Sequence, residues 1–568
     1  MGTRRVLIVG GVAGGASCAA RLRRLDESGE IIVFERGPYV SFANCGLPYY
    51  VGNVIQEEKK LLVATPGLFR NRFNIEVRTG HEVTAIDRQA REIEVREAAS
   101  GRVYRERYDA LVLSPGAAPV RPPLPGIDLE GIFTLRTIPD SRSIREWIEK
   151  RRARRAVVVG AGFIGLEMTE NLAARGLEVT LLEAAPQVMP LLDREMANLI
   201  EHRLRKHGVH LRTGDPVTDF EAKDGELLVK TKSRQAFLAE MVILSIGVKP
   251  ESGLARAAGL DIGATGGIRV DACMRTSDPA IWAVGDAVEV RDAVTGTPCL
   301  APLAGPANRQ GRIAADSIAG RPTAFRGVQA TAVCGCFGLT IAVTGATEKR
   351  LHACGFTDFQ SVYLHPNQHV AYYPGAKPIH MKLTYQVPGG RILGAQAVGE
   401  EGVERRIDVL SMALQKQATV FDLEEAELCY APQYGAAKDP VNLAGMVAAN
   451  ALRGDVPLAE WEEIPVTDAF LLDVRDPHEF AAGSIPGAVN IPLPQLSSRL
   501  AELPREREIW VQCGVGQRSY YAVRLLAQHG FRVKNLPGGF TTFKAFYSEG
   551  LSKPPSAEAR LTEQREKI

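Results

Sequence analysis

Ala156-Val-Val-Val-Gly160-Ala-Gly162-Phe-Ile-Gly165 joins a short apolar run to a complete G-x-G-x-x-G fingerprint. The apolar run predicts a buried β-strand, and the glycines predict a tight turn that opens a helix. A second strand, 179–182, ends at Glu183, which can accept hydrogen bonds from ribose hydroxyls. Positions 184 and 185 are both alanine, so no neighbouring arginine is present to bind a 2′-phosphate. The stretch therefore predicts a nucleotide-binding α/β domain that takes NADH rather than NADPH.

The chain begins with an imperfect copy of this pattern. Apolar residues 5–9 lead into Gly10-Gly-Val-Ala-Gly-Gly15, a helix follows, and the strand 31–34 ends at Glu35. Val12 occupies the middle glycine position, so this copy alone is a weak signal. Backbone N–H groups of such a turn can approach a pyrophosphate, so two copies suggest two bound dinucleotides. The cofactor-binding candidates in the two copies are Gly10, Val12, Ala13, Gly15, Glu35, Arg36, Gly160, Gly162, Gly165 and Glu183.

A single cysteine lies in the stretch Ser41-Phe-Ala-Asn-Cys45-Gly-Leu-Pro-Tyr-Tyr-Val-Gly52. The next cysteine in sequence is Cys273, so Cys45 has no local partner for a disulfide. Cys45 would instead cycle through a mixed disulfide, a persulfide or a sulfenic acid. The alternative is a buried, inert cysteine. Polar Ser41 and Asn44, and the turn-forming glycine and proline that follow, favour a reactive cysteine.

The composition of the 568-residue chain indicates about three or four globular domains. The apolar fraction is 45%, and the net charge of +2 gives no reason to expect a nucleic acid or a membrane surface as a partner. No run of about 18 apolar residues predicts a transmembrane helix. Nine cysteines cannot all pair, and in a chain of this length they predict a reducing, cytoplasmic compartment.

Two further segments resemble the FAD-binding motifs of the pyridine nucleotide-disulfide oxidoreductases. They are Leu111-Val-Leu-Ser-Pro-Gly116 and the segment 276–286, which ends in Gly285-Asp286. With the two glycine turns, they follow the order of this family over residues 1–445. The resemblance implies FAD in the first domain, NADH in the second, and contact of Asp286 with the ribityl chain of the flavin. It adds the cofactor-binding candidates Pro115, Gly116, Gly285 and Asp286.

Within that family, the segment around Cys45 resembles the active site of coenzyme A-disulfide reductases, which carry a single redox cysteine beside the flavin. Related NADH oxidases and peroxidases also use one cysteine, as a sulfenic acid. Peroxidases have a histidine in the first glycine turn. The first histidine of this chain is His81, which counts against peroxidase chemistry.

One face of the helix after the first turn could clamp a phosphate. Ser17, Arg21 and Arg24 fall at i, i+4 and i+7. Two arginines on one face suit phosphate oxygens, although a solvated basic face gives the same pattern. The resemblance implies that coenzyme A is held by Ser17, Arg21, Arg24, Ser41 and Asn44.

Residues 326–445 resemble the dimerisation domain of the family, which implies a homodimer. The segment 429–442 matches one that faces the redox cysteine of the partner subunit in the family's dimer. The candidates by that match are Tyr372 and Tyr430 as acids or hydrogen-bond donors, and Lys438 and Asn308 as contacts of the coenzyme A substrate. An interface or core aromatic is the alternative for any single tyrosine.

Cys334-Gly-Cys336, with Cys354 nearby, invites comparison with a metal site. The segment 331–344 is β-branched and apolar, so both cysteines of the pair are predicted to lie on one face of a strand. A metal site would need more ligands at suitable spacing, so no metal is predicted.

A linker, 446–461, precedes a small α/β pattern, 462–555. The third strand of this pattern ends at the loop Cys513-Gly-Val-Gly-Gln-Arg518, which leads into a helix. Such a loop can turn its N–H groups inward, and the helix N-terminus and Arg518 add positive potential. Both effects would favour a thiolate or a terminal persulfide at Cys513. The pattern resembles rhodanese domains, whose binding-only variants usually lack this cysteine.

The sequence thus predicts an α/β protein with two Rossmann-like nucleotide-binding domains, an α+β dimerisation domain and a C-terminal α/β rhodanese domain. The predicted boundaries are 1–115 and 245–325 for the FAD-binding domain, 116–244 for the NADH-binding domain, 326–445 for the dimerisation domain, 446–461 for the linker, 462–555 for the rhodanese domain and 556–568 for a disordered tail.

The predicted function is FAD-dependent reduction, by NADH, of the sulfur–sulfur bond of coenzyme A persulfide or polysulfide through Cys45. The rhodanese domain favours this substrate, because reduction of coenzyme A disulfide needs no sulfur carrier. Cys513, aided by Arg518, would relay the sulfane sulfur. The alternatives are coenzyme A-disulfide reduction itself, NADH oxidase activity, and a non-enzymatic sulfur-relay or redox-sensing role.

Overall fold

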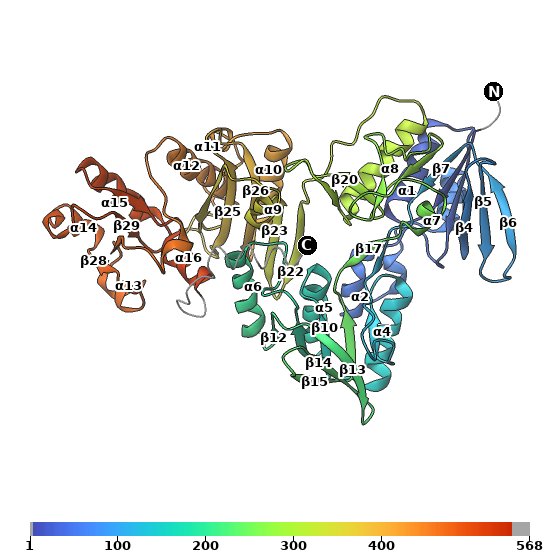
Figure 1. The fold of residues 1–568 in the computed structure, drawn as a ribbon, viewed down its shortest axis with the longest axis horizontal. Helices are drawn as coiled ribbons and strands as arrows, with labels where there is room; N and C mark the ends of the chain where they lie inside the picture. The colour runs from blue at the N-terminus through green and yellow to red at the C-terminus, as the bar shows by residue number, and fades with distance from the viewer. Residues whose placement is uncertain (1–3, 548–568) are drawn as a thin grey trace. The chain divides into compact units, whose positions relative to one another are not determined.

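The computed structural model describes residues 4–547, which form two compact units (Figure 1). The first unit contains the residues up to 190 and 204–332, and the second contains 191–203 and the residues from 333 onward. The predicted disordered tail, 556–568, lies outside the described residues. Within the described part, no helix is both long and apolar enough to cross a membrane.

The first glycine turn belongs to a five-stranded parallel sheet. Its elements are β1 (Arg5–Val9), β2 (Glu30–Glu35), β3 (Glu76–Thr79), β7 (Ala110–Leu113), β19 (Ile281–Ala283), α1 (Ala13–Leu25) and α8 (Ala304–Ile318). The strand order is β19-β7-β1-β2-β3, and α1 packs against α8. Both faces of β1 and β7 are covered, which explains their unbroken apolar runs. β19 pairs in this first sheet but comes late in the chain. The segment that forms the second sheet is therefore inserted in sequence between β7 and β19.

The second glycine turn belongs to another five-stranded parallel sheet in the same unit. Its elements are β9 (Ile132–Thr134), β10 (Arg155–Val159), β11 (Glu178–Leu182), β12 (His210–Arg212), β16 (Met241–Leu244), α4 (Ile138–Arg151) and α5 (Phe163–Ala174). Most of the next helix, α6 (Arg194–Lys206), belongs to the second unit. The strand order is β12-β11-β10-β16-β9. Thr137 and Asp140 form a capping box that starts α4. The two predicted Rossmann-like units are confirmed.

Smaller elements complete the first unit. The helices are η1 (Asn44–Gly46), α2 (Leu47–Val51), η2 (Glu58–Leu61), α3 (Pro66–Phe73) and α7 (Gly253–Ala257). The strands are β4 (His81–Asp87), β5 (Glu92–Glu97), β6 (Val103–Arg107), β8 (Ala117–Pro119), β13 (Val217–Lys223), β14 (Glu226–Thr231), β15 (Ala236–Ala239), β17 (Val248–Pro250), β18 (Ile268–Arg269), β20 (Val288–Arg291) and β21 (Pro298–Leu300). They pair as β4-β5-β6, β13-β14-β15, β17-β8 and β18-β20-β21.

The second unit contains the predicted α+β domain. Its elements are β22 (Ala332–Cys336), β23 (Leu339–Gly345), β24 (Phe359–Leu364), β25 (Ile379–Gln386), β26 (Ile392–Gly399), α9 (Glu348–Ala353), α10 (Val403–Gln415), α11 (Val420–Glu424) and α12 (Pro440–Leu452). The sheet order is β22-β23-β26-β25-β24, with antiparallel pairs from β23 to β24. Cys334 and Cys336 are buried in β22, so the predicted strand is confirmed.

The same unit contains the C-terminal α/β domain. Its elements are η3 (Trp461–Glu463), β27 (Phe470–Asp473), α13 (Pro477–Ala481), β28 (Val489–Asn490), α14 (Leu493–Leu496), η4 (Leu500–Glu502), β29 (Ile509–Gln512), α15 (Gln517–Gln528), β30 (Val533–Asn535) and α16 (Gly539–Phe546). The parallel strand order is β28-β27-β29-β30. Residues 456–461 were predicted as linker, but Val456, Ala459 and Trp461 are buried in the cores of this region. Packing of this domain therefore begins before residue 462.

Candidate active sites

Both glycine turns adopt the same backbone geometry. Gly10 and Gly160 have φ angles of +90° and +100°, a region that favours glycine. A Cβ atom at Gly15 would lie 1.9 Å from the carbonyl oxygen of Gly10, and one at Gly165 would lie 1.9 Å from that of Gly160. Glycine is therefore required at the first and last fingerprint positions, because each helix starts in close contact with the preceding strand end.

The middle fingerprint position tolerates valine for a conformational reason. Val12 and Gly162 have negative φ angles, −95° and −81°, so neither position needs the positive φ that favours glycine. No heavy atom lies within 4 Å of a Cβ atom built at Gly162, so the start of α5 is open. Ala13 is the first residue of α1. Helix starts of this kind present N–H groups that suit a pyrophosphate.

The acid at the end of each second strand is fixed by the glycine turn beside it. The Glu35 carboxylate accepts hydrogen bonds from the N–H groups of Gly11 (2.9 Å) and of the residue two positions after the acid (2.9 Å). The Glu183 carboxylate accepts the equivalent hydrogen bonds from the N–H group of Ala161 (2.6 Å) and from that of the residue two positions after Glu183 (2.8 Å). A carboxylate has about four acceptor positions, so both keep positions for ribose hydroxyls.

The remaining candidates from the FAD-type motifs lie where strands of the first sheet end. Pro115 and Gly116 follow β7, Gly285 and Asp286 follow β19, and the parallel pairing of the two strands brings them to one edge. Gly116 and Gly285 have φ angles of +79° and +85°. Burial raises the pKa of Asp286, whereas Arg136, whose Nη2 lies 3.3 Å from the carboxylate, lowers it.

Cys45 lies in η1, immediately before α2, and is exposed. Partial loss of water around its sulfur raises the pKa of the thiol, the carboxylates of Glu167 and Asp286 raise it further, and Arg136 lowers it. The buried Oδ1 atom of Asn44 accepts no hydrogen bond within the described residues, so it can accept one from a ligand. Sequence reasoning missed Glu167 and Arg136 as members of this site.

Two contacts tie the cysteine segment to both nucleotide-binding sheets. The Tyr49 hydroxyl donates to Glu167 (3.1 Å), which lies in the first turns of α5. Burial raises the pKa of Glu167, and this hydrogen bond lowers it. Ser41 has a φ angle of +48°, unusual for a residue with a side chain, and its N–H group donates to the carbonyl of Gly11 (2.8 Å). The sequence signal that could have indicated the contact with Tyr49 is the position of Glu167, shortly after the second fingerprint.

Two arginines predicted to bind ligands are already paired with carboxylates. Arg36 donates to both oxygens of Glu251 (2.7 and 2.5 Å). Arg21 donates two hydrogen bonds to one oxygen of Asp316 on α8 (3.0 and 2.7 Å). Their positive charges are therefore largely neutralised by the protein itself.

Of the other coenzyme A candidates on α1, Ser17 contacts α8. The Ser17 hydroxyl is hydrogen-bonded to the side chain of Asn308, which confirms that these distant residues lie together. Arg24 is exposed on α1. The predicted two-arginine clamp thus consists of one paired arginine and one exposed arginine.

The second unit brings two predicted tyrosines together. The hydroxyl oxygens of Tyr372 and Tyr430 lie 2.9 Å apart, although both residues are exposed. This hydrogen bond raises the pKa of Tyr430. Lys438 is also exposed and directly precedes Asp439, the N-cap of α12. The pair and the lysine are accessible to a substrate or another subunit.

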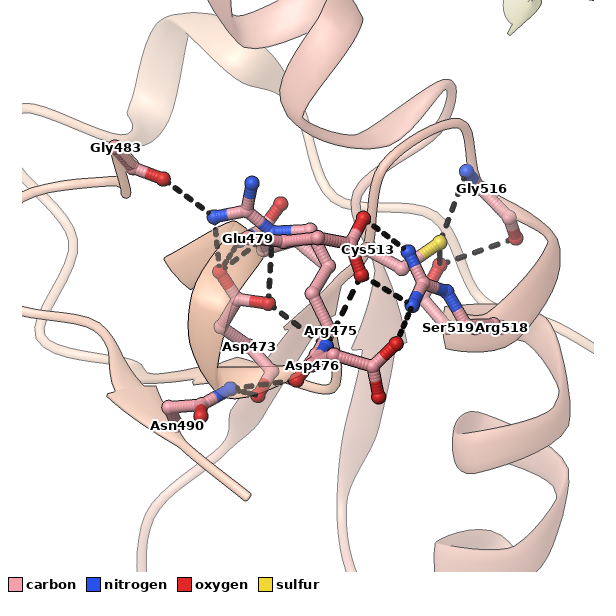
Figure 2. Close-up of polar contacts among 11 residues, drawn as sticks. Asp473, Arg475, Asp476, Glu479, Gly483, Asn490, Cys513, Gly516, Arg518 and Ser519 are labelled. Atoms are coloured by element: carbon pink, nitrogen blue, oxygen red, sulfur yellow. Dashed lines mark hydrogen bonds and ion pairs between the residues drawn. The ribbon is translucent and has the colours of Figure 1, made fainter. Parts of the chain in front are cut away.

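The loop after β29 surrounds a buried cysteine (Figure 2). The Cys513 sulfur accepts hydrogen bonds from the N–H group of Gly516 (3.2 Å) and from the Ser519 hydroxyl (3.5 Å). Gly516 has a φ angle of +98°, which turns its N–H group toward the sulfur. The predicted inward-facing donors are therefore present, and Ser519 is an addition that the sequence did not suggest.

Arg518 is ion-paired rather than unopposed. Its two terminal nitrogens donate to both oxygens of Glu479 (2.6 and 2.7 Å), and Asp476 lies 3.5 Å away (Figure 2). This pairing lowers the pKa of Glu479 to about 2. The positive potential predicted from Arg518 is therefore offset by carboxylates of α13 and its cap.

No group of three or more His, Cys, Asp or Glu residues in the range 4–547 could hold a metal ion.

Comparison with known sequences assigns all three predicted regions. Residues 4–308 match the family described as pyridine nucleotide-disulphide oxidoreductase, residues 331–439 match its dimerisation domain, and residues 458–546 match a rhodanese-like domain. These matches confirm the resemblances predicted from the sequence motifs.

Individual relatives agree with this assignment. The coenzyme A disulfide reductase of Staphylococcus haemolyticus is 36% identical over 446 residues, which cover 78% of this chain and 99% of that protein. The solved structure of reduced Bacillus anthracis CoADR-RHD is 46% identical, with a TM-score of 0.94 over 96% of this chain and 98% of that one. The NAD-dependent persulfide reductase from A. fulgidus is 39% identical, with a TM-score of 0.89 over 95% and 100% of the two chains. The present chain therefore belongs to the pyridine nucleotide-disulphide oxidoreductase family.

Proposed function

We propose that this protein is an FAD-dependent reductase that uses NADH to cleave the sulfur–sulfur bond of coenzyme A persulfide. The observation that carries the proposal is the presence of two cysteine sites in one chain. Cys45 is exposed in a segment fixed to both nucleotide-binding sheets, and Cys513 is buried in a loop of sulfur-directed donors. Relatives named for persulfide and coenzyme A disulfide reduction support this reading.

The first glycine turn and its surroundings fit FAD. The Glu35 carboxylate keeps acceptor positions for ribose hydroxyls, the start of α1 offers N–H groups, and the Asn44 Oδ1 atom is a buried acceptor without a donor among the described residues. When bound, FAD supplies the transfer of two electrons from NADH to the redox cysteine. Glu183 holds the NADH ribose in the second domain.

The Cys45 thiolate acts as the nucleophile. Its attack on coenzyme A persulfide breaks the sulfur–sulfur bond and expels either hydrosulfide or the coenzyme A thiolate, which leaves Cys45 in a mixed disulfide or as a persulfide. In both cases two electrons from one NADH restore the thiolate and release the second product. Partial burial of the sulfur raises the pKa of Cys45 and disfavours the free thiolate, as do Glu167 and Asp286, whereas Arg136 favours the thiolate.

The active unit is a homodimer in which Tyr372, Tyr430 and Lys438 face the redox cysteine of the other subunit. The match of residues 331–439 to a dimerisation domain and the exposure of the tyrosine pair support this arrangement. A reducing, cytoplasmic compartment suits chemistry that needs the Cys45 and Cys513 thiols. Light scattering of the purified protein tests the assembly, and a fully active monomer would contradict it.

Turnover of NADH with coenzyme A persulfide, coenzyme A disulfide or oxygen as the sole acceptor tests the function. We expect the persulfide to give the highest kcat/KM. Cys45→Ser should retain bound FAD and its reduction by NADH but lose at least about 1,000-fold in turnover, because a hydroxyl is a poor nucleophile and leaving group here. Near-normal persulfide turnover by Cys45→Ser would place the chemistry elsewhere.

The same assay tests the role of the second cysteine. Cys513→Ser should leave reduction of preformed coenzyme A persulfide within about twofold of the wild type, because Cys513 acts before the reduction step. It should impair turnover when sulfur must first be taken from polysulfide. Equal loss with both substrates would mean that Cys513 takes part in the reduction itself.

A further inference from the structure

Two arginines near Cys513 are each engaged by carboxylates. Arg475 is buried, binds both oxygens of buried Asp473 and donates to the carbonyl of Gly483 (2.7 Å). Its guanidinium also lies 4.3 Å from the centre of the Phe540 ring. These contacts hold Arg475 in place, so it cannot turn toward an incoming anion without breaking several of them.

Arg518 forms its ion pairs on the more exposed side of the Cys513 site. Glu479 binds both of its terminal nitrogens, and Asp476 approaches one of them at 3.5 Å. The side chains of Arg518 and Glu479 are about one-third exposed, at 33% and 30%, whereas Cys513 is 1% exposed. An incoming sulfur donor therefore meets this ion-paired group on the exposed side of the loop.

Carboxylates outnumber guanidinium groups around the loop by one. Asp473, Asp476 and Glu479 face Arg475 and Arg518, as Figure 2 shows. The sulfur itself is contacted by neutral donors, the Gly516 N–H group and the Ser519 hydroxyl. Such donors stabilise the single charge of a bound persulfide, but the surrounding carboxylates oppose a dianion.

We propose that Glu479 and Asp476 restrict Cys513 to persulfide donors and disfavour thiosulfate; the inference rests on the proposed sulfur-relay role. In the favoured reaction the Cys513 thiolate attacks the outer sulfur of R–S–SH, a new S–S bond forms at Cys513, the S–S bond of the donor breaks, and R–S⁻ leaves. With thiosulfate the same attack must expel the sulfite dianion. The sulfite dianion has to form beside Arg518, whose N–H donors are already bound to Glu479.

Sulfur transfer to cyanide measures this preference without NADH. The full-length protein carries Cys45→Ser, so that transfer through Cys513 alone is followed, and Cys513→Ser supplies the blank. The donors are glutathione persulfide and thiosulfate, and the product is thiocyanate. We expect the kcat/KM ratio of persulfide to thiosulfate to exceed about 10, and Glu479→Gln to shift it at least about tenfold toward thiosulfate, because one negative charge beside the dianion is removed.

Asp476→Asn is a second variant that keeps the fold, because asparagine caps a helix as well as aspartate does. It should shift the ratio in the same direction by a smaller factor, since Asp476 lies farther from Arg518. The matched control is Glu502→Gln, which breaks the similar bidentate pair with Arg499 (2.7 Å for both bonds) and should leave the ratio unchanged.

The outcomes separate this inference from the proposed function. A wild-type preference for thiosulfate, or a ratio altered less than about twofold in both Glu479→Gln and Asp476→Asn, overturns the selectivity role and leaves the relay intact. Failure of both donors to load Cys513 overturns the relay, and the selectivity inference with it.

Discussion

Glu183 is positioned to select the nicotinamide cofactor. Its carboxylate is 9% exposed and is held by two backbone N–H groups. Because those bonds keep it in place, a 2′-phosphate on the ribose would meet a fixed negative charge. The same carboxylate retains acceptor positions for the two hydroxyls of an unphosphorylated ribose.

We expect kcat/KM to favour NADH over NADPH by about 100-fold, since like charges placed together cost several kcal/mol. Glu183→Gln keeps an acceptor oxygen for Ala161 but removes the charge, so it should reduce the preference at least about tenfold. Glu178→Gln, an exposed position at the start of the same strand, is the matched control. Equal use of both cofactors by the wild type would show that Glu183 does not select.

At the scale of one element, helix α16 connects the Cys513 loop to the dimerisation sheet. The N–H groups of Phe540 and Thr541 donate to the carbonyls of Cys513 (2.7 Å) and Gly514 (3.0 Å). The hydroxyl of the next residue, Thr542, lies 2.7 Å from Nε2 of His365, just after β24. The helix therefore carries any displacement at that hydrogen bond to the backbone of the loop.

Thr542→Val removes the hydroxyl at nearly constant volume and leaves a buried imidazole nitrogen without its partner. The expected cost is about 1–3 kcal/mol, with a several-fold loss of sulfur transfer through Cys513. Thr542→Ser keeps the hydroxyl and should restore most of the transfer. The pH profile of Cys513 alkylation, followed by mass spectrometry, distinguishes a displaced loop from general unfolding. Equal behaviour of the valine and serine variants would exclude a positioning role for this bond.

In the second unit, one fully buried lysine contacts three acids, two at the start of α6 and one at the start of α9. The Lys382 ammonium lies 2.9 Å from Asp193, 2.5 Å from Glu195 and 2.9 Å from Glu348. The Tyr363 hydroxyl also donates to Glu195 (3.1 Å). One positive charge cannot neutralise three carboxylates, and burial raises the pKa of Glu195 to about 7.

Glu195 makes the stability of this unit depend on pH. Its pKa rises from 4.5 to about 7 on folding, so between these values the folded state binds a proton that the unfolded state does not. The stabilising contribution is therefore complete below about pH 4.5 and is lost as pH rises through about 7. We expect the melting temperature of this unit to fall as pH rises from about 4.5 to about 7, and Glu195→Gln to reduce that fall.

The titration of two other acids must be distinguished from the titration of Glu195. Burial also raises the pKa of Glu460 to about 7, so Glu460→Gln is the necessary control. The pKa of Asp193 is lowered instead, because Lys382 and other donors outweigh the effect of its burial, so its contribution is lost only as pH falls. An unchanged pH dependence in Glu195→Gln would assign the titration to another group.

The folding pattern could be predicted from the sequence alone, and the sequence also supplied the candidate residues for the chemistry. The first fingerprint glycine has a positive φ angle, and the last lies where a helix starts against a strand end. Both requirements are local and can be recognised within about ten residues. Cys45 and Cys513 were likewise recognisable from the residues immediately around them. Local backbone geometry is encoded locally, which is why the two nucleotide-binding units and the sulfur loop were predictable.

Only the tertiary structure decided which charges remain available. Arg21 and Arg518 look alike in sequence, as cations on helices beside a binding site, but Asp316 and Glu479 neutralise them from positions 295 and 39 residues away. Glu167 is brought to Cys45, and Lys382 to Glu195, by the same long-range packing. Ion pairs form between side chains that the fold brings within about 4 Å, so the electrostatics of these sites could not be derived from spacing along the chain.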